Sequence, residues 1–441
     1  MDIQEALEYL NRFQFHGFRL GLERMHAILA AMGHPESTYP VIHVAGTNGK
    51  GSSCAMIESI LSAAGYRTGL YSSPHLYRLN ERFRVQGRDI SDTQLASVLT
   101  AIRQLIESGY EMSYFEYTTA AAMECFRQEE VDIAVLETGL GGRLDATNVV
   151  TPLVSVITNV TLEHQAYLGN TVEEIAFEKA GIVKEGRPVV CGQSQGPALT
   201  VIRERCRQLK APLRVLGLDF SLERHGQHLV WRGWDGRVID GICLGLDGPH
   251  QVSNAALSIA AVTLLADDGF LVRDDHIRQG CSSVAWPGRG ELFHMDGSDI
   301  LIDGAHNIAG IKALSDLLHG MGIDGRGGKK GDVLLWACSD EGGDKNFAGM
   351  LRSLSSLFRY VIVTEPPGPR KPVTVQAWQD VWTDDMSGDN GYLIEGQWVR
   401  AFDAAMERCP KGGLVCVAGS LYLVGSVRAE IMSRLSLPGH T

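Results

Sequence analysis

Short apolar runs alternate with segments of helical periodicity through the first 210 residues of the chain. Helical spacing is clear at 54–64, where Met56, Ile57 and Ile60 share one face. Strand, loop and helix recurring in this order predict a doubly wound α/β sheet of mainly parallel strands. The strand-like runs are 39–45, 66–71, 131–136, 153–158 and 188–192; the helical segments are two in the first 35 residues, then 54–64, 92–107, 115–127, 171–181 and 198–209.

The pattern changes from about residue 195 to residue 285. The stretch 228–239 is typical of a hairpin with its turn at Asp235-Gly236, and a helix is expected at 251–262. A turn cluster at 286–290 precedes further strand-like runs at 300–303, 334–337, 360–364 and 414–417. The sequence therefore predicts a large doubly wound α/β domain at 1–288 and a smaller Rossmann-like α/β domain at 289–441. The polar stretch 72–88 and the glycine-rich stretch 325–331 are expected to be loops.

A glycine-rich turn joins the strand at 39–45 to the following helix and offers the clearest chemistry. Gly46, Gly49 and Gly51 let backbone N–H groups approach an anion at a helix N-terminus. Lys50 would reach the terminal phosphates of a nucleotide, and Ser52 or Ser53 offers a hydroxyl to Mg²⁺. The spacing is tighter than the strict G-x4-G-K-[ST], so we interpret the stretch as a variant P-loop that binds ATP. The alternative is that the glycines only form a turn.

Polar groups follow several other predicted strands, where ligands of open α/β sheets bind. Glu137 is placed where a metal-binding carboxylate is needed, and His164 is a candidate metal ligand. A surface acid and a core or surface histidine are the alternatives. Asp303 and His306 form a similar cluster in the second domain. Lys179, in the last turn of the helix at 171–181, could be a surface lysine that complements the helix dipole.

Composition excludes several classes of function. The net charge of −12 argues against nucleic acid, because duplex binding depends on phosphate neutralisation. The first residues are acidic and amphipathic rather than signal-like, and no stretch approaches the roughly 20 apolar residues of a transmembrane helix. Nine cysteines without a C-x-x-C motif indicate reduced core thiols. We therefore expect a cytoplasmic, monomeric protein with no nucleic-acid or membrane partner.

Taken in order, the motifs of this chain resemble those of the folate branch of the Mur ligase superfamily, the dihydrofolate synthase/folylpolyglutamate synthases. The resemblance covers nearly the whole chain. It is carried by the stretches 20–24, 45–52, 71–76, 81–87, 115–117, 137–148, 178–181, 286–289 and 303–307.

The resemblance implies an ATP-dependent ligase that adds L-glutamate to dihydropteroate or folate through an acyl phosphate. It implies an ATP-binding domain at 1–288, a glutamate ligase domain at 289–441, and two Mg²⁺ ions. The site residues that it implies are Gly49, Lys50, Gly51 and Ser52 for the ATP phosphates; Asn254, Arg289 and Asp303 for the nucleotide; Ser73, Glu137 and His164 for Mg²⁺; Lys179, carbamylated, and His306 beside the reacting groups; and Gly21, Leu22, Glu23, Arg24, Phe115, Gly141, Gly142 and Arg143 for the pterin substrate. On local pattern alone, Glu23 and Arg24 are a solvated surface pair.

The chain departs from the family pattern at three places. Glu163 stands before the metal histidine where Asp is usual, Gly290 follows Arg289 where a larger apolar residue is commoner, and 342–346 replaces an Asp-Lys-Asp motif. Three alternatives remain open: a monofunctional folylpolyglutamate synthase, a cell-wall Mur ligase, and a P-loop ATPase that acts as a binding module.

Overall fold

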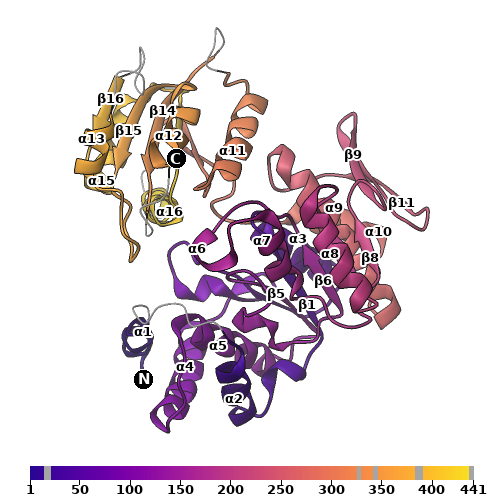
Figure 1. The fold of residues 1–441 in the computed structure, drawn as a ribbon. Helices are drawn as coiled ribbons and strands as arrows, with labels where there is room; N and C mark the ends of the chain where they lie inside the picture. Colours follow the sequence, from indigo (N-terminus) through magenta and orange to yellow (C-terminus); the bar gives the residue numbers. More distant parts are fainter. Residues whose placement is uncertain (14–20, 325–328, 341–345, 383–390, 437–441) are drawn as a thin grey trace. The chain divides into compact units, whose positions relative to one another are not determined.

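The computed structural model describes residues 1–13, 21–324, 329–340, 346–382 and 391–436 (Figure 1). These residues form two compact units. Unit 1 consists of Met1–Gly245 and Gln251–Ala285, and unit 2 of Leu246–His250 and Trp286–Thr441.

The sheet of unit 1 has eight strands among the described residues, in the order β4-β3-β2-β5-β1-β6-β7-β8. Its bounds are β1 Val41–Ala45, β2 Thr68–Tyr71, β3 Phe83–Val85, β4 Arg88–Asp89, β5 Ile133–Glu137, β6 Val154–Ile157, β7 Val189–Cys191 and β8 Leu213–Val215. In the part of this order that runs β2-β5-β1-β6-β7-β8, all neighbouring strands are parallel. Every residue of β1 is buried, as expected for a central strand covered on both faces.

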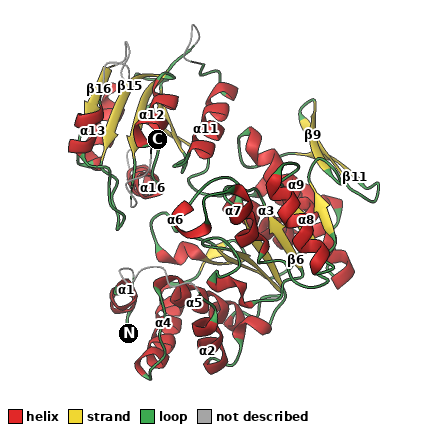
Figure 2. Ribbon diagram, viewed as in Figure 1, coloured by secondary structure: helices red, strands yellow, loops and turns green. Residues whose placement is uncertain are grey.

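Helices cover both faces of this sheet (Figure 2). One core cluster packs the α1, α2, α4 and α5 side chains against Val41 and Leu136, and another packs α7 and α8 against Ala45 and Ile157. The predicted doubly wound fold is confirmed. The helix bounds are α1 Ile3–Asn11, α2 Glu23–Ala31, α3 Lys50–Ala63, α4 Asp92–Glu107, α5 Tyr114–Gln128, α6 Gln165–Leu168, α7 Val172–Ala180, α8 Pro197–Gln208, α9 Pro249–Leu264 and α10 Asp274–Ser283.

The stretch 72–88 is not the plain loop that its polarity predicts. It contains a short 3₁₀ turn, Leu79–Arg82, and then β3 and β4, which extend the sheet in antiparallel fashion. Phe83 is fully buried with its ring centroid 5.8 Å from that of Tyr71, so one aromatic residue anchors an otherwise polar hairpin.

A separate small sheet of unit 1 has the order β11-β10-β9. Its strands are β9 Ser221–His225, β10 His228–Arg232 and β11 Val238–Ile242, and the predicted Asp235-Gly236 turn joins the last two. We did not expect β9, because Leu222 is the one apolar residue in its sequence.

Unit 2 has a six-stranded sheet among its described residues, in the order β12-β13-β17-β14-β15-β16. The four predicted runs are its central strands, whereas the edge strands β12 and β16 were not predicted, because β12 has one buried residue and β16 has none. Its elements are β12 Glu291–Met295, β13 Ser298–Ile302, α11 Ile308–Gly320, β14 Gly331–Ala337, α12 Phe347–Ser355, β15 Phe358–Thr364, α13 Val375–Val381, β16 Gly391–Ile394, α15 Trp398–Arg408, β17 Leu414–Ala418 and α16 Leu421–Ser436.

Two expectations from composition can be compared with the structure. None of the nine cysteines, all within the described ranges, forms a disulfide, and Cys243 alone among them is exposed. In the described parts of the chain, no helix is both long enough and apolar enough to span a bilayer.

The packing of α10 on α3 yields a test of the fold. A Cβ on Gly280 would lie 2.4 Å from the Ile60 Cα, a backbone atom that cannot rotate away. We expect Gly280→Ala to lower the free energy of unfolding by about 1–3 kcal/mol, the usual range for overpacking. Urea denaturation followed by circular dichroism measures this change.

Gly320→Ala is the matched control. Gly320 also lies in a helix, but a Cβ there would meet nothing within 4 Å, so the change should be neutral or stabilising by up to about 1 kcal/mol. Equal effects of the two substitutions would contradict the close approach of α10 to α3.

Candidate functional site

The phosphate-loop candidate lies between β1 and α3. The helix begins at Lys50, four residues before its apolar pattern starts, so Lys50, Gly51 and Ser52 form its first turn. Gly49 caps the helix in the left-handed conformation, with φ of 82°. The unpaired N–H groups of a first helical turn favour an anion. The loop therefore has the local structure that phosphate binding requires.

Close packing explains two of the glycines in this loop. A Cβ on Gly46 would lie 1.8 Å from the Thr158 Oγ1, and one on Gly49 would lie 2.4 Å from the Asn254 Oδ1. Any larger residue would push the loop away from its supports.

The segment after β6 braces the loop. The Asn48 N–H donates to the Asn159 Oδ1 (2.9 Å), and the Thr158 hydroxyl donates to the Asn48 carbonyl (2.7 Å). Within the loop, the Lys50 Nζ donates to the carbonyls of Gly46 (3.0 Å) and Thr47 (3.2 Å). The ammonium group is thus held over the loop by two neutral carbonyls. Thr158 and Asn159 were not predicted as site residues, although they stand at the carboxyl end of a predicted strand, where ligands of open α/β sheets bind.

Asn254 reaches the loop from α9. Its Nδ2 donates to the Gln251 Oε1 (2.8 Å), and the Gln251 Nε2 lies 3.5 Å from the Ser52 Oγ. Asn254 and Ser52, predicted from separate motifs, therefore lie at one place.

Two of the three predicted metal ligands are adjacent. The Ser73 N–H donates to the Glu137 Oε2 (3.3 Å), and Glu137, the last residue of β5, is buried. Burial raises the pKa of the Cys54 thiol, Glu137 raises it further and Lys50 lowers it, so both charges lie close to this first part of α3. A buried carboxylate next to a serine residue suits Mg²⁺, which takes one or two carboxylates and keeps several waters.

The third predicted metal ligand, His164, precedes α6 in a left-handed conformation with φ of 51°. Its side chain is 46% exposed, and its Nε2 lies 3.9 Å from the Glu163 Oε1. The described residues hold no group of three or more His, Cys, Asp or Glu side chains arranged to bind a metal, so any Mg²⁺ here must take hydroxyls, water or phosphate as well.

Lys179 is buried, which rules out the surface-lysine alternative. It lies in the last turn of α7 with 3% of its surface exposed. Burial, and to a smaller extent the nearby Lys50 charge, lower its pKa to about 7, against the opposing effect of Glu163 and Asp145. Lys50 and Lys179 therefore contribute positive charge to the same region.

The Gly141–Arg143 turn is packed against the end of α7. A Cβ on Gly142 would lie 2.8 Å from the Glu178 carbonyl oxygen, and the Arg143 N–H donates to that same oxygen (2.7 Å). The Arg143 Nη2 lies 2.8 Å from the Glu178 Oε1, and the guanidinium carbon lies 5.6 Å from the centroid of the Phe177 ring. Arg143 thus connects this turn to the helix that carries Lys179.

Arg24 does not form a solvated pair with Glu23. Its guanidinium contacts both carboxylate oxygens of Glu116 on α5, at 2.9–3.3 Å. Glu116 is buried, so the pair joins α2 to α5. The ring of the neighbouring Phe115 packs closely against Gly139. A Cβ on Gly139 would lie 2.4 Å from this ring.

The start of that motif is only partly described. Gly21 has φ of 134°, and Leu22 caps α2, whereas Leu20 lies outside the described residues.

In unit 2, the Asp303 side chain accepts hydrogen bonds from two backbone N–H groups near the end of β13. Its Oδ2 accepts from the Gly290 N–H and its Oδ1 from the Ala305 N–H, both at 2.8 Å. Burial raises the pKa of Asp303, and the Arg289 charge opposes this shift. The His306 Nδ1 lies 2.7 Å from the Gly304 carbonyl oxygen, and a Cβ on Gly304 would meet the Arg289 Nη1 at 2.1 Å. The three predicted residues of this unit therefore lie together.

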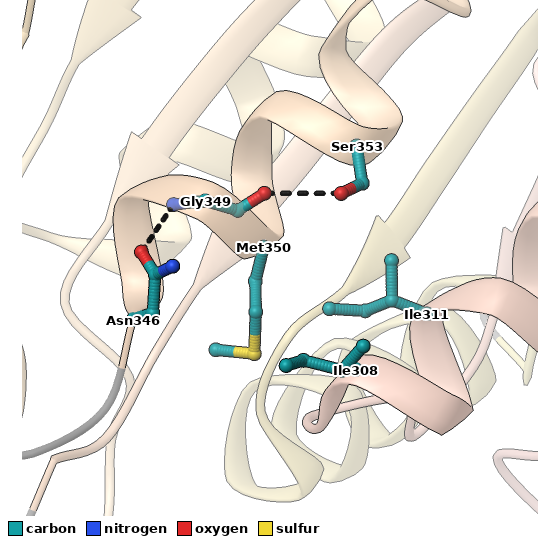
Figure 3. Close-up of a pocket in the computed structure, with 6 residues that line it drawn as sticks. All are labelled: Ile308, Ile311, Asn346, Gly349, Met350 and Ser353. Atoms are coloured by element: carbon teal, nitrogen blue, oxygen red, sulfur yellow. Dashed lines mark hydrogen bonds between the residues drawn. The ribbon is translucent and has the colours of Figure 1, made fainter.

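A pocket of about 220 Å³ lies between α11 and α12 of unit 2 (Figure 3). The side chains of Ile308, Ile311 and Met350 converge in it, and Asn346, Gly349 and Ser353 complete its lining. We did not predict this pocket. The departure at 342–345 lies outside the described residues, which resume at Asn346.

Known proteins match this chain over its full length. Residues 44–262 match the Mur ligase middle domain. The dihydrofolate synthase/folylpolyglutamate synthase of Bacillus subtilis is 34% identical over 97% of this chain and 99% of its own length. The folylpolyglutamate synthase of Lacticaseibacillus casei is 32% identical over 98% of this chain and 99% of its own length. The chain belongs to the dihydrofolate synthase/folylpolyglutamate synthase family.

Solved structures of the family agree with the fold. The Escherichia coli enzyme FolC in complex with DHPP and ADP superimposes with a TM-score of 0.87, 32% identity and 99% coverage of both chains. The resemblance inferred from the sequence motifs is confirmed, and the chain is an enzyme, a ligase of the Mur ligase family.

The buried Lys179 should make stability depend on pH. Because folding lowers its pKa, the native state binds fewer protons than the unfolded state between about pH 7 and 10.5, so stability rises with pH across that window. We expect Lys179→Met to stabilise the protein at pH 6.5 by on the order of a few kcal/mol and to lose this advantage towards pH 9.5.

Urea unfolding in bicarbonate-free buffer measures this effect. The control is Lys411→Met, a change at an exposed lysine that should leave the pH profile unchanged. Parallel profiles for wild type and Lys179→Met would show that Lys179 is not desolvated.

Proposed function

We propose that this ligase uses ATP and Mg²⁺ to add L-glutamate to dihydropteroate and to reduced folates. The observation that carries the proposal is the joint placement of Lys50, buried Lys179 and buried Glu137 at the phosphate loop of a chain aligned end to end with this family. The complex of the E. coli enzyme with DHPP and ADP supports both a pterin substrate and a nucleotide.

In the proposed reaction, a substrate carboxylate attacks the γ-phosphorus of ATP and forms an acyl phosphate, with release of ADP. The glutamate amine then attacks the acyl carbon, and inorganic phosphate leaves as the amide bond forms. Phosphoryl transfer of this kind depends on positioning and on cations around the phosphates rather than on a covalent residue.

The phosphate loop supplies the positioning. The first-turn N–H groups of Gly51 and Ser52 would hold the phosphates, together with Gly49. The Lys50 ammonium can leave its two carbonyl partners to follow the charge on the transferred phosphoryl group. Both steps thereby gain electrostatic stabilisation where charge develops.

Ser73, Glu137 and His164 would hold Mg²⁺, and a carbamate on Lys179 would help to hold a second ion. Bound Mg²⁺ neutralises phosphate charge and orients the transferred group. An amine with a pKa of about 7 is neutral in a substantial fraction of molecules at physiological pH, and the neutral amine is the form that reacts with CO₂. The low pKa therefore supports carbamylation of Lys179.

The remaining predicted residues complete the proposal. Asn254, Arg289 and Asp303 would contact the nucleotide, and His306 would lie beside the reacting groups. Gly21, Leu22, Glu23, Arg24, Phe115 and the Gly141–Arg143 turn would form the pterin side. An ATP-binding domain at 1–288, from which Leu246–His250 is excluded because it belongs to unit 2, a glutamate ligase domain at 289–441, a monomeric state and a cytoplasmic location are further parts of this proposal.

Lys50→Ala tests the phosphate-loop assignment. Loss of the cation should lower kcat by about a hundredfold or more, on the order of 3 kcal/mol in the barrier, with little change in unfolding temperature. ADP release in the presence of dihydropteroate and glutamate measures kcat, and Lys411→Ala serves as the control. A folded Lys50→Ala variant with near-native turnover would remove Lys50 from the site.

A substrate comparison tests the scope of the reaction. We expect ADP release that requires glutamate with both dihydropteroate and tetrahydrofolate, because both pterin-side motifs are present. Activity with tetrahydrofolate alone would favour a monofunctional folylpolyglutamate synthase, the activity named for the L. casei relative. ATP hydrolysis that needs neither acceptor would indicate an ATPase instead.

A further inference from the structure

A buried chain of hydrogen bonds connects β1 to the segment that follows β5. His43, in the middle of β1, is fully buried, and its Nε2 lies 2.8 Å from the Thr147 Oγ1. The Thr147 hydroxyl in turn lies 2.5 Å from the Asp145 Oδ1. All three side chains belong to unit 1 and are buried.

The donors and acceptors in this chain have one consistent arrangement. A carboxylate only accepts, so the single hydroxyl proton of Thr147 goes to Asp145. The hydroxyl oxygen then accepts from His43, which must carry its proton on Nε2. Burial lowers the pKa of His43 to about 3, in agreement with a neutral ring, and its Nδ1 is buried with no hydrogen-bond partner among the described residues.

Asp145 closes the loop in which it lies. Its Oδ2 accepts from the Leu140 N–H (2.9 Å) and its Oδ1 from the Thr147 N–H (3.0 Å). One carboxylate therefore ties both ends of the segment 140–147 together. Each of its oxygens is held by a backbone donor, so Asp145 cannot shift without moving the loop.

The same loop joins two parts of the proposed site. It starts directly after Glu137, and it is attached to the end of α7 through the Arg143 N–H and through the Asn148 Nδ2, which donates to the Gly181 carbonyl (3.2 Å). The helix α7 carries Lys179. In β1, His43 lies three residues before Gly46, the first glycine of the phosphate loop. Beside the backbone hydrogen bond from the Thr138 N–H to the Val44 carbonyl, His43 is therefore a side chain that links the strand before the phosphate loop to the 138–148 loop.

We propose that His43 and Thr147 are positioning residues, which hold the 138–148 loop and the end of α7 in register with the phosphate loop through Asp145. This inference rests on the proposed function, because the register matters only if phosphoryl transfer occurs between these parts. A displacement of about 1 Å at a reacting centre can cost roughly a hundredfold in rate, so a small loosening of the chain should be measurable.

Thr147→Val removes the hydroxyl at nearly constant volume and is the principal test. We expect kcat for glutamate addition to fall about tenfold or more, while the KM for ATP and the affinity for ADP stay within about twofold, since the phosphate loop is untouched. Thr147→Ser, which keeps the hydroxyl, should retain at least about a third of wild-type kcat. A merely structural role would instead lower the unfolding temperature without this separation of kcat from KM.

A control and a double variant sharpen the test. Thr364→Val makes the same change at a buried threonine of unit 2 whose hydroxyl has no hydrogen-bond partner in the described parts of the chain, and kcat should not change. The kcat of the double variant His43→Leu/Thr147→Val should be no more than about threefold below that of the slower single variant, because both substitutions break the same chain of hydrogen bonds.

The outcomes separate the two proposals. An inactive wild-type enzyme with dihydropteroate, tetrahydrofolate and glutamate would overturn the proposed function, and with it this inference. An active wild type with a Thr147→Val variant at half its kcat or more would overturn the inference alone. Losses that multiply in the double variant, or a raised KM for ATP with unchanged kcat, would do the same.

Discussion

Two lysine side chains place positive charge in one region of unit 1, and the proposed site depends on how that charge is balanced. Lys179 is almost completely buried and Lys50 acts on it, so a second full positive charge there is disfavoured. The protein balances this with the charges of Glu163 and Asp145 and with the depressed pKa of Lys179. An anionic ligand, a carbamate or both would complete the balance. The free site is therefore electrostatically prepared for phosphate.

The sequence predicted the parts of the fold that short-range pattern determines. Central strands such as β1, β5 and β14 are mainly apolar because both faces are covered, and each was found within a few residues. Edge strands were missed because exposure permits polar residues. Within β12, exposed residues alternate with half-buried ones and Met295 is the one buried residue, and β9 also has one buried residue, so neither gives the signal of a buried run.

The residues of the candidate site likewise fall into those that a local sequence pattern reveals and those that it does not. The phosphate loop and Glu137 could be found because a strand end and a glycine turn are local features. The Arg24–Glu116 pair joins residues 92 positions apart, and no local pattern reveals such a partner. The burial of Lys179 likewise depends on what packs over the end of α7, and a lysine in a last helical turn is ordinarily taken for a surface residue. Long-range packing decided both cases.

The segment Leu246–His250 belongs to unit 2, although its last two residues begin α9, whose other residues belong to unit 1. Within unit 2, the charges of Asp303 and Arg289 act on His250, and a Cβ on Gly290 would lie 3.7 Å from the Asp247 carbonyl oxygen. No single cut can therefore divide this polypeptide into its two units. A fragment that ends at Ala285 would carry five residues stripped of their packing partners, and one that begins at Trp286 would lack them. Dissecting the enzyme into separately expressed halves requires a circular permutation or a deliberate replacement of this segment.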